Sequence, residues 1–304
     1  MWLRVLKLGF NIYCKLMMPI FVYKTRKGYK DWDKYTIQTL PTLLNCDAKT
    51  AKKIYLKGIY QQAKFHLAYA FFFGKYGQAL VADELQKVQI KNPQLVAQAA
   101  ETGRPVIFLS IHMGIFYMGF LKLANSFTTD RTINLVKIAK TSGREASLSK
   151  KIKQTCPNVE FIRFDHRTGE RIYSQLKANN AVVMMMDRET RVEGRTTVNL
   201  LGRQCYIQNG PAKLAVATKA IVIPVVNYID KQGCNIIEVA QPIDGKKQPN
   251  KTATTAVDRV MAELAGHMEK WLTAHPDQMH YWPYIMFTIN RDKQQKIRHN
   301  FKYT

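Results

Sequence analysis

The chain has 304 residues, of which 46% are hydrophobic, a composition that supports one sizeable core and excludes wholesale disorder. Its 46 lysines and arginines outnumber its 22 aspartates and glutamates, so the formal net charge is +24. A field of this sign attracts nucleic acid, anionic lipid or an acidic carrier protein, and charge alone does not choose among them. The basic residues are spread along the whole chain without an RNA-binding or zinc-finger signature, which disfavours nucleic acid as a partner.

The cysteines are five in number and scattered, and no two of them form a CxxC pair. No histidine lies at zinc-finger spacing from any of them. An odd, dispersed set argues against a disulfide framework and against structural zinc, and it indicates a reducing compartment such as the cytoplasm. The set comprises Cys14, Cys46, Cys156, Cys205 and Cys234.

The first 23 residues have neither an uninterrupted apolar stretch nor a cleavage site, so they do not resemble a secretory signal. Basic residues also interrupt any clean transmembrane span. At helical spacing one face is apolar and aromatic: Trp2, Leu3, Leu6, Phe10, Tyr13, Met17 and Ile20. The other face carries Arg4, Lys7, Asn11 and Lys15. This pattern predicts an amphipathic helix at the headgroup boundary of an anionic bilayer, and the alternative is a helix packed on its own domain.

The segment 23–30 adds four basic and two aromatic residues that suit phosphate headgroups. We therefore expect residues 1–30 to form a membrane-associated helical N-terminus and residues 31–304 to form a single α/β domain. A tilted transmembrane span with snorkelling lysines is the other membrane arrangement that the pattern allows.

The remaining elements alternate between helices and short apolar strands. Apolar runs bounded by glycine, proline or polar residues predict buried strands at 106–110, 133–136, 159–162, 181–186 and 221–226. Helical spacing predicts helices at 47–75, 113–123, 172–176, 212–218 and 257–272. This order predicts the α/β class, a mixed sheet flanked by helices. The three methionines at 184–186 are expected to fill the core rather than to form a binding pocket.

Two polar segments follow directly after predicted strands. Ser110-Ile111-His112 ends one strand, and Asp187-Arg188-Glu189 ends another. In sheets of this kind, functional groups gather just past the carboxyl ends of strands. A neutral imidazole at such a position can take a proton from an alcohol. His112 is therefore a candidate general base, although a lone histidine is more often a structural residue.

Several short motifs follow one another along the chain. A strand runs into the His-x-Gly of residues 112–114, and the 182–188 strand ends in Asp-Arg. The segment 210–215 reads Gly-Pro-Ala-Lys-Leu-Ala, and 276–282 reads Pro-x-Gln-x-x-x-Trp. Together with Val198–Arg203 and Ile223-Pro224, these segments resemble, in order, the motifs of the lipid A biosynthesis (lauroyl/myristoyl) acyltransferases of the lysophospholipid acyltransferase superfamily. The similarity extends from about residue 100 to residue 283.

The resemblance implies a reaction that moves an acyl chain from acyl carrier protein or coenzyme A to a hydroxyl on a membrane lipid, without metal or cofactor. It implies that His112 is the general base and that a nearby acid orients and stabilises its imidazole. The expected partners are the acyl thioester donor and an anionic membrane lipid. The expected location is the cytoplasmic face of the bacterial inner membrane.

The sequence departs from the family pattern five residues after His112, where Tyr117 replaces the expected acid. A phenol is neutral at pH 7 and cannot stabilise an imidazolium as a carboxylate does. Two hypotheses would preserve catalysis: Asp187 or Glu189 approaches His112, or the acceptor is a stronger nucleophile than a sugar hydroxyl. The alternative function is a catalytically weak or silent homologue that binds acyl chains or lipids.

The remaining candidates are substrate-binding residues. Arg188 and Arg191 would bind a phosphate of the lipid or of phosphopantetheine, since Arg suits bidentate phosphate binding; the alternative is a solvated loop. Arg163 follows a strand and resembles the second block of the superfamily, although a surface arginine fits equally well. Asn209, with Gln208, would border the pocket, or the following Gly-Pro simply begins a helix. Tyr117 completes the catalytic set with His112 and Asp187.

Overall fold

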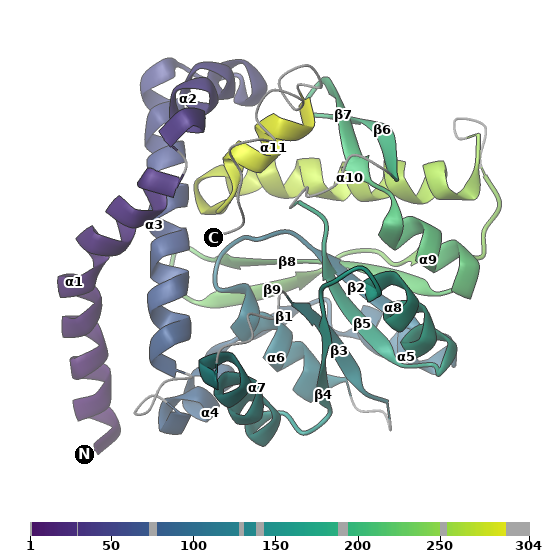
Figure 1. Cartoon of the computed structure of the whole chain (residues 1–304), viewed down its shortest axis with the longest axis horizontal. Coiled ribbons are helices and arrows are strands. Elements are labelled where there is room, and N and C mark those ends of the chain that lie inside the picture. The colour runs from purple at the N-terminus through teal and green to yellow at the C-terminus, as the bar shows by residue number, and fades with distance from the viewer. Residues whose placement is uncertain are drawn as a thin grey trace.

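The structure is a computed structural model that describes residues 2–28, 30–72, 78–127, 131–137, 143–187, 194–249 and 254–289. It has the predicted mixed α/β architecture (Figure 1). The strands are β1 (Gln89–Lys91), β2 (Val106–Ser110), β3 (Ile133–Lys137), β4 (Val159–Arg163), β5 (Ala181–Met185), β6 (Arg195–Leu200), β7 (Arg203–Gln208), β8 (Ile221–Ile229), β9 (Asn235–Val239) and β10 (Ile243–Asp244).

The helices alternate with the strands through most of the chain. They are α1 (Trp2–Gly28), α2 (Lys30–Leu44), α3 (Ala48–Phe72), α4 (Gln78–Lys87), α5 (Gln94–Glu101), α6 (Phe116–Ser126), α7 (Gly143–Thr155), α8 (Thr168–Lys177), α9 (Gly210–Thr218), α10 (Ala256–Ala274) and α11 (Trp282–Ile289). A short 3-10 helix, Pro276–Gln278, lies between α10 and α11.

The main sheet has the strand order β1-β9-β8-β2-β5-β3-β4, with β10 paired to β8. β2 runs parallel to β5 and to β8, and β3 runs parallel to β4 and β5. β8 and β9 pair antiparallel, which makes the sheet mixed. All five residues of β2 are buried, as expected for a central strand covered on both faces. β6 and β7 form a separate antiparallel hairpin.

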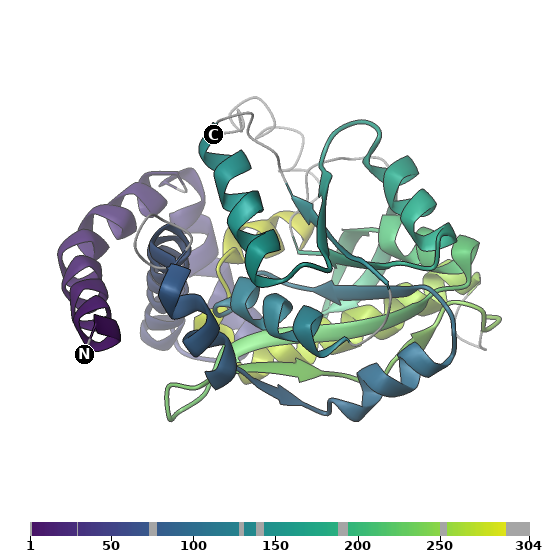
Figure 2. The same ribbon diagram turned by 90° about the horizontal axis from the view of Figure 1, so that it is seen from below.

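Each face of the sheet carries its own layer of helices, because side chains alternate along the strands. Ile107 and Leu109 of β2 pack in one core cluster with α10, whereas Val106 and Phe108 pack in the other with α5 and α6. Thr255 caps the N-terminus of α10: its hydroxyl accepts a hydrogen bond from the Asp258 N–H at 3.1 Å. The helices α1, α2 and α3 gather at one end of the sheet (Figures 1 and 2).

The N-terminal helix α1 was expected to have one apolar face toward the membrane and one basic face, but part of the apolar face packs on the domain. Phe10, Tyr13 and Met17, predicted to face a bilayer, pack against the domain instead; the rings of Phe10 and Phe71 are 4.6 Å apart. A second apolar row is exposed, and it consists of Leu8, Ile12, Leu16, Ile20 and Tyr23. The prediction of a single apolar face was wrong because α1 is apolar on two sides and α3 covers one of them.

No helix in the described ranges combines the length and the apolar character that crossing a bilayer requires. The five predicted strands and the long helices at 48–72 and 256–274 lie where the sequence placed them, within a few residues. The helix predicted over 113–123 begins only at Phe116, because Met113 pairs with Met279 and Gly114 adopts a positive φ of 60°. The strands β1, β6, β7, β9 and β10 were not predicted.

Candidate active site

His112 and Asp187 meet at one edge of the sheet because their strands are parallel neighbours. Ser110 at the end of β2 is in register with Met185 at the end of β5. His112 and Asp187 each follow two residues later, so the same offset places their side chains next to each other. Asp187 is 1% exposed, which makes it a buried carboxylate at the end of a buried strand.

The Asp187 carboxylate contacts His112 with both of its oxygens. Oδ1 lies 2.8 Å from the imidazole Nδ1, and Oδ2 accepts the backbone N–H of His112 at 3.0 Å. A carboxylate beside Nδ1 favours the tautomer in which Nδ1 carries the proton, which leaves the lone pair of Nε2 available as a base. The same negative charge stabilises the imidazolium that forms when Nε2 takes a proton.

Two aromatic rings pack against the imidazole of His112. The ring of Phe116 is 5.1 Å away and that of Tyr281 is 4.9 Å away, and both meet His112 edge to face. The His280 N–H donates to the His112 carbonyl at 3.0 Å, and the Gly114 N–H reaches the Gln278 carbonyl at 3.4 Å. Two backbone hydrogen bonds and the Tyr281 ring therefore attach the segment 278–281 to the loop that carries His112.

The glycine of the His-x-Gly pattern is required by the backbone at this point. Gly114 has φ of +60°, a conformation that side chains with a Cβ rarely adopt. A Cβ at this position would lie 2.7 Å from the carbonyl oxygen of Asn227 on β8. The loop after β2 thus lies directly on β8, and the close approach fixes the direction in which the chain leaves His112.

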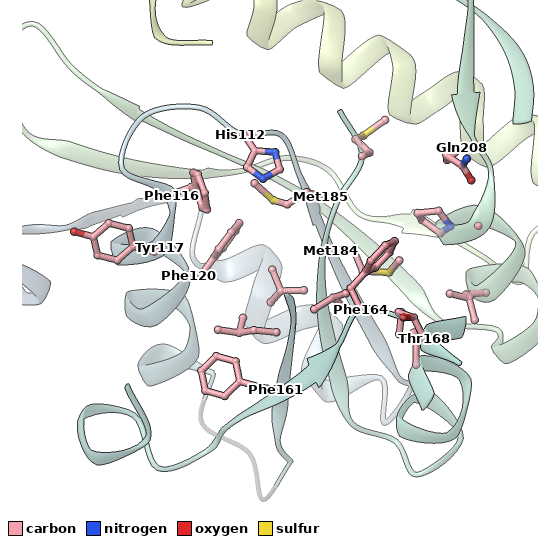
Figure 3. Close-up of a pocket in the computed structure, with 18 of the residues that line it drawn as sticks. His112, Phe116, Tyr117, Phe120, Phe161, Phe164, Thr168, Met184, Met185 and Gln208 are labelled. Atoms are coloured by element: carbon pink, nitrogen blue, oxygen red, sulfur yellow. The ribbon is translucent and has the colours of Figure 1, made fainter. Parts of the chain in front are cut away.

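Tyr117 lies in the wall of the site and does not take the place of an acid. Its side chain is 8% exposed, and its ring packs against Phe65 at 5.3 Å and Tyr69 at 5.2 Å. Burial, followed by the negative charges that Tyr69, Glu84 and Cys14 can carry, raises the pKa of the Tyr117 phenol well above its usual range. Figure 3 shows its hydroxyl pointing away from His112. The carboxylate beside the imidazole is that of Asp187.

His280 is a second histidine close to His112. Its ring is 2% exposed and packs against Phe65 and Phe116 at 5.4 and 5.9 Å. Within the described residues neither ring nitrogen has a hydrogen-bond partner. Burial is the main cause that lowers the pKa of His280 well below its usual value, and repulsion from His112 and His66 lowers it further. The Gly114 backbone has a smaller, opposite effect. This buried ring is therefore neutral at pH 7.

A cavity of about 490 Å³ opens beside His112 (Figure 3). Its lining is mostly apolar and comes from α6, β3, β4, β5 and α7: Phe116, Phe120, Leu121, Leu135, Ile152, Phe161 and Val183. A smaller polar part is formed by Asp165, His166, Thr168 and Gln208. In Figure 3, Phe161 lies at the end of the apolar part opposite His112. A cavity of this size and character suits a hydrocarbon chain.

All three methionines at 184–186 line this cavity. The expectation that they fill the core rather than form a pocket was wrong for Met184 and Met185, whereas Met186 is 8% exposed and does belong to the core as well. Met184 and Met185 are half-buried at the carboxyl end of β5, whereas the first three residues of the strand are buried. The flexible thioether side chains suit a wall that must adapt to a ligand.

Neither Arg163 nor Asn209, the two other predicted binding residues that the structure describes, lines the cavity. The Arg163 side chain is exposed, and Arg163 does not line the cavity, although its carbonyl accepts from Thr168 and Arg171. Asn209 is buried at the start of α9, where its amide donates to Thr196 at 3.0 Å; its neighbours Gln208 and Gly210 line the cavity. Arg188, Glu189 and Arg191 lie outside the described residues.

Two residues of the polar part, Asp165 and His166, were missed from the sequence. They follow β4 at the same two- to three-residue offset that identified His112 after β2. The Arg171 guanidinium, 2.7 Å away, is the main cause that lowers the pKa of the Asp165 carboxyl. Within the described ranges, no three His, Cys, Asp or Glu side chains come close enough together to hold a metal ion.

A histidine paired with a buried aspartate, at the mouth of an apolar cavity on an α/β sheet, defines a site equipped for base-assisted chemistry on a substrate with a hydrocarbon part. The family model for bacterial lipid A biosynthesis acyltransferases matches residues 62–284, and the chain belongs to this family. The match runs from α3 into α11 and includes His112, Asp187 and the whole cavity lining. No curated protein is similar enough in sequence to count as a match.

Proposed function

We propose that the protein is an O-acyltransferase that moves a fatty acyl chain from a thioester donor to a hydroxyl of a membrane lipid or lipid-linked glycan of the lipid A type. The donor is acyl carrier protein or coenzyme A. The observation that carries the proposal is the His112–Asp187 pair, with its 2.8 Å contact, at the mouth of the apolar cavity.

The proposed reaction begins when Nε2 of His112 takes the proton of the acceptor hydroxyl. The hydroxyl oxygen attacks the thioester carbonyl carbon and forms a C–O bond, and a tetrahedral oxyanion results. The C–S bond then breaks, and the departing sulfur receives the proton from His112. Ester and free thiol are the products, and no proton is gained or lost overall. Asp187 holds the imidazole and stabilises its cation between the two steps.

The apolar part of the cavity is the proposed site of the acyl chain. The chain would extend from His112 toward Phe161, which lies opposite His112 in the apolar part of the cavity (Figure 3). The polar part, with Asp165, His166 and Gln208, is left for the hydroxylated head of the acceptor or the arm of the donor. Burial of the hydrocarbon provides binding energy of about 0.8 kcal/mol for each methylene.

The proposed location is the surface of an anionic membrane, on the cytoplasmic side of the bacterial inner membrane. The exposed row on α1 has its residues spaced by four along the helix and by three at its end, and Leu16 within it is 70% exposed. α1 lies at the outer edge of the molecule in both views (Figures 1 and 2). Its last turn carries Arg26 and Lys27, which suit phosphate headgroups. In this proposal residues 1–30 dock on the bilayer and 31–304 form the catalytic domain.

The test is acyl transfer from labelled acyl carrier protein, and separately from acyl coenzyme A, into a bacterial lipid extract, read by mass spectrometry. Wild type is compared with His112→Ala and with the control Lys231→Ala, an exposed residue in the turn between β8 and β9 that lines neither of the cavities. We expect a new acylated lipid from wild type and from the control, and none from His112→Ala. The mass of the product identifies the acceptor, and the two donors are compared directly.

The alternative, a silent homologue that binds acyl chains or lipids, rests on the replacement of the motif acid by Tyr117. Its distinguishing result is binding of an acyl donor or lipid without any product from wild type. The position of Asp187, which supplies a carboxylate to His112, favours the enzyme over this alternative.

A further inference from the structure

A second cavity, of about 320 Å³, lies between α10 and the strands β8 and β9. None of its lining residues lines the cavity beside His112. Its volume is within the range of small-molecule sites. Acyl transfer is proposed for the cavity beside His112, and the second cavity therefore has no role in that reaction.

One wall is a row of side chains along α10. His267, Trp271 and His275 are spaced by four residues, which places them on one face of the helix, and Lys270 lines the same cavity. The His267 and Trp271 rings are 6.0 Å apart. Lys270 is exposed and forms no ion pair in the part of the chain that the structure describes.

The opposite wall comes from β8 and β9. Tyr228 stacks on His275 at 3.9 Å with the rings nearly parallel. The Tyr228 hydroxyl donates to Glu238 at 3.1 Å and accepts from the Lys91 ammonium at 2.5 Å, and Lys91 lies 3.8 Å from Glu238. The negative charge of Glu238, the single carboxylate that lines this cavity, is thus balanced by the Lys91 ammonium and hydrogen-bonded by the Tyr228 hydroxyl.

The uncompensated charge in this cavity is therefore positive and lies at its His267 end. Lys270 follows His267 by three residues on α10. Burial, followed by the Lys270 charge, lowers the pKa of His267, while Glu263 on the preceding turn raises it. At the other end of the cavity, burial is the main cause that lowers the pKa of His275, and Lys91 also lowers it. Glu238 and Asp277 raise this pKa by smaller amounts. α10 also ends there, and the C-terminus of a helix repels anions. An anion would accordingly bind beside His267 and Lys270.

We propose that this cavity binds a small molecule that carries one oxyanion group on a short apolar body. The oxyanion lies beside His267 and Lys270. The apolar body lies against Trp271, Val226 and Ala240. Because the bound anion favours the protonated form of His267, binding tightens as the pH falls.

The test is isothermal titration calorimetry on the full chain with butyl phosphate, butyrate and 1-butanol, at pH 6 and at pH 8. The two anions distinguish phosphate from carboxylate, and the alcohol measures the apolar part alone. We expect at least one anion to bind roughly tenfold more tightly than 1-butanol, and more tightly at pH 6 than at pH 8. His267→Gln removes the protein's share of the pH dependence, and Lys270→Gln weakens binding at both pH values.

His166→Gln is the matched control, because His166 lines the other cavity. The proposal stands if the control binds as wild type does while the two α10 variants bind less tightly. It is overturned if neither anion binds better than 1-butanol, or if both α10 variants bind the anion as wild type does. Lys270 is exposed, so its substitution tests the site without disturbing the core.

Discussion

Replacing Asp187 by asparagine removes the charge beside His112 while keeping the size of the side chain. The asparagine oxygen would accept the His112 backbone N–H in place of Oδ2, and its amide nitrogen would then face Nδ1. Two N–H groups cannot face each other, so the imidazole would place its proton on Nε2, the nitrogen that must act as the base. The variant would also lack the charge that stabilises the imidazolium.

The expected loss in kcat is about 10³- to 10⁴-fold, the scale of the corresponding change in a serine protease triad, which is roughly 4 to 5.5 kcal/mol of transition-state stabilisation. The assay is the initial rate of ester formation from the acyl thioester, with the melting temperature measured in parallel to show that the variant is folded. Tyr117→Phe is the matched control, because the Tyr117 hydroxyl points away from His112 (Figure 3). We expect the control to keep its rate within about threefold, since it removes no charge. A folded Asp187→Asn with less than a tenfold loss would refute the assignment of Asp187.

Three further predictions concern the cavity, the loop and the buried histidine. Phe161→Ala should shift donor preference toward longer acyl chains, by about fourfold in kcat/KM for each added methylene that fits, because it lengthens the apolar part of the cavity. Competing donors of graded length in one reaction measure the shift. Gly114→Ala should lower the free energy of unfolding by about 2–4 kcal/mol, because a Cβ meets the Asn227 carbonyl in a left-handed backbone conformation; urea unfolding measures it. Folding lowers the pKa of His280, so the unfolded state binds more protons than the folded state below about pH 6.5. The free energy of unfolding of wild type should therefore fall as the pH drops below about 6.5, by up to about 1.4 kcal/mol per pH unit more than that of His280→Phe. Equal acid sensitivity of the two proteins in urea unfolding would contradict the neutral, buried assignment.

The main strands could be predicted from the sequence because they depend on local pattern. A fully apolar run between breakers, such as 106–110, has few alternatives to a buried strand. The offset of polar residues after such strands was also enough to select His112 and Asp187. The strands β1 and β9, which lie side by side at one end of the sheet, were missed because they are short or partly polar. Their pairing is decided by neighbours distant in the sequence.

What the sequence could not provide was the geometry between elements. The acid partner of His112 is 75 residues away in the chain, and only the parallel register of β2 and β5 brings it within 2.8 Å. Tyr117 has the spacing of the motif acid, yet the start of α6 at Phe116 turns it toward α3. Likewise, helical spacing shows that α1 has apolar positions, but not which of them α3 covers.

A His112-dependent transfer of the acyl group from a thioester to a lipid hydroxyl can be followed by measuring free thiol and lipid ester together in one reaction, with and without the acceptor lipid. Wild type should release one thiol for each ester formed and should release little thiol without acceptor, and His112→Ala should form neither product. If folded wild type binds the acyl donor and the lipid but produces no thiol and no ester, the protein is not the proposed acyltransferase.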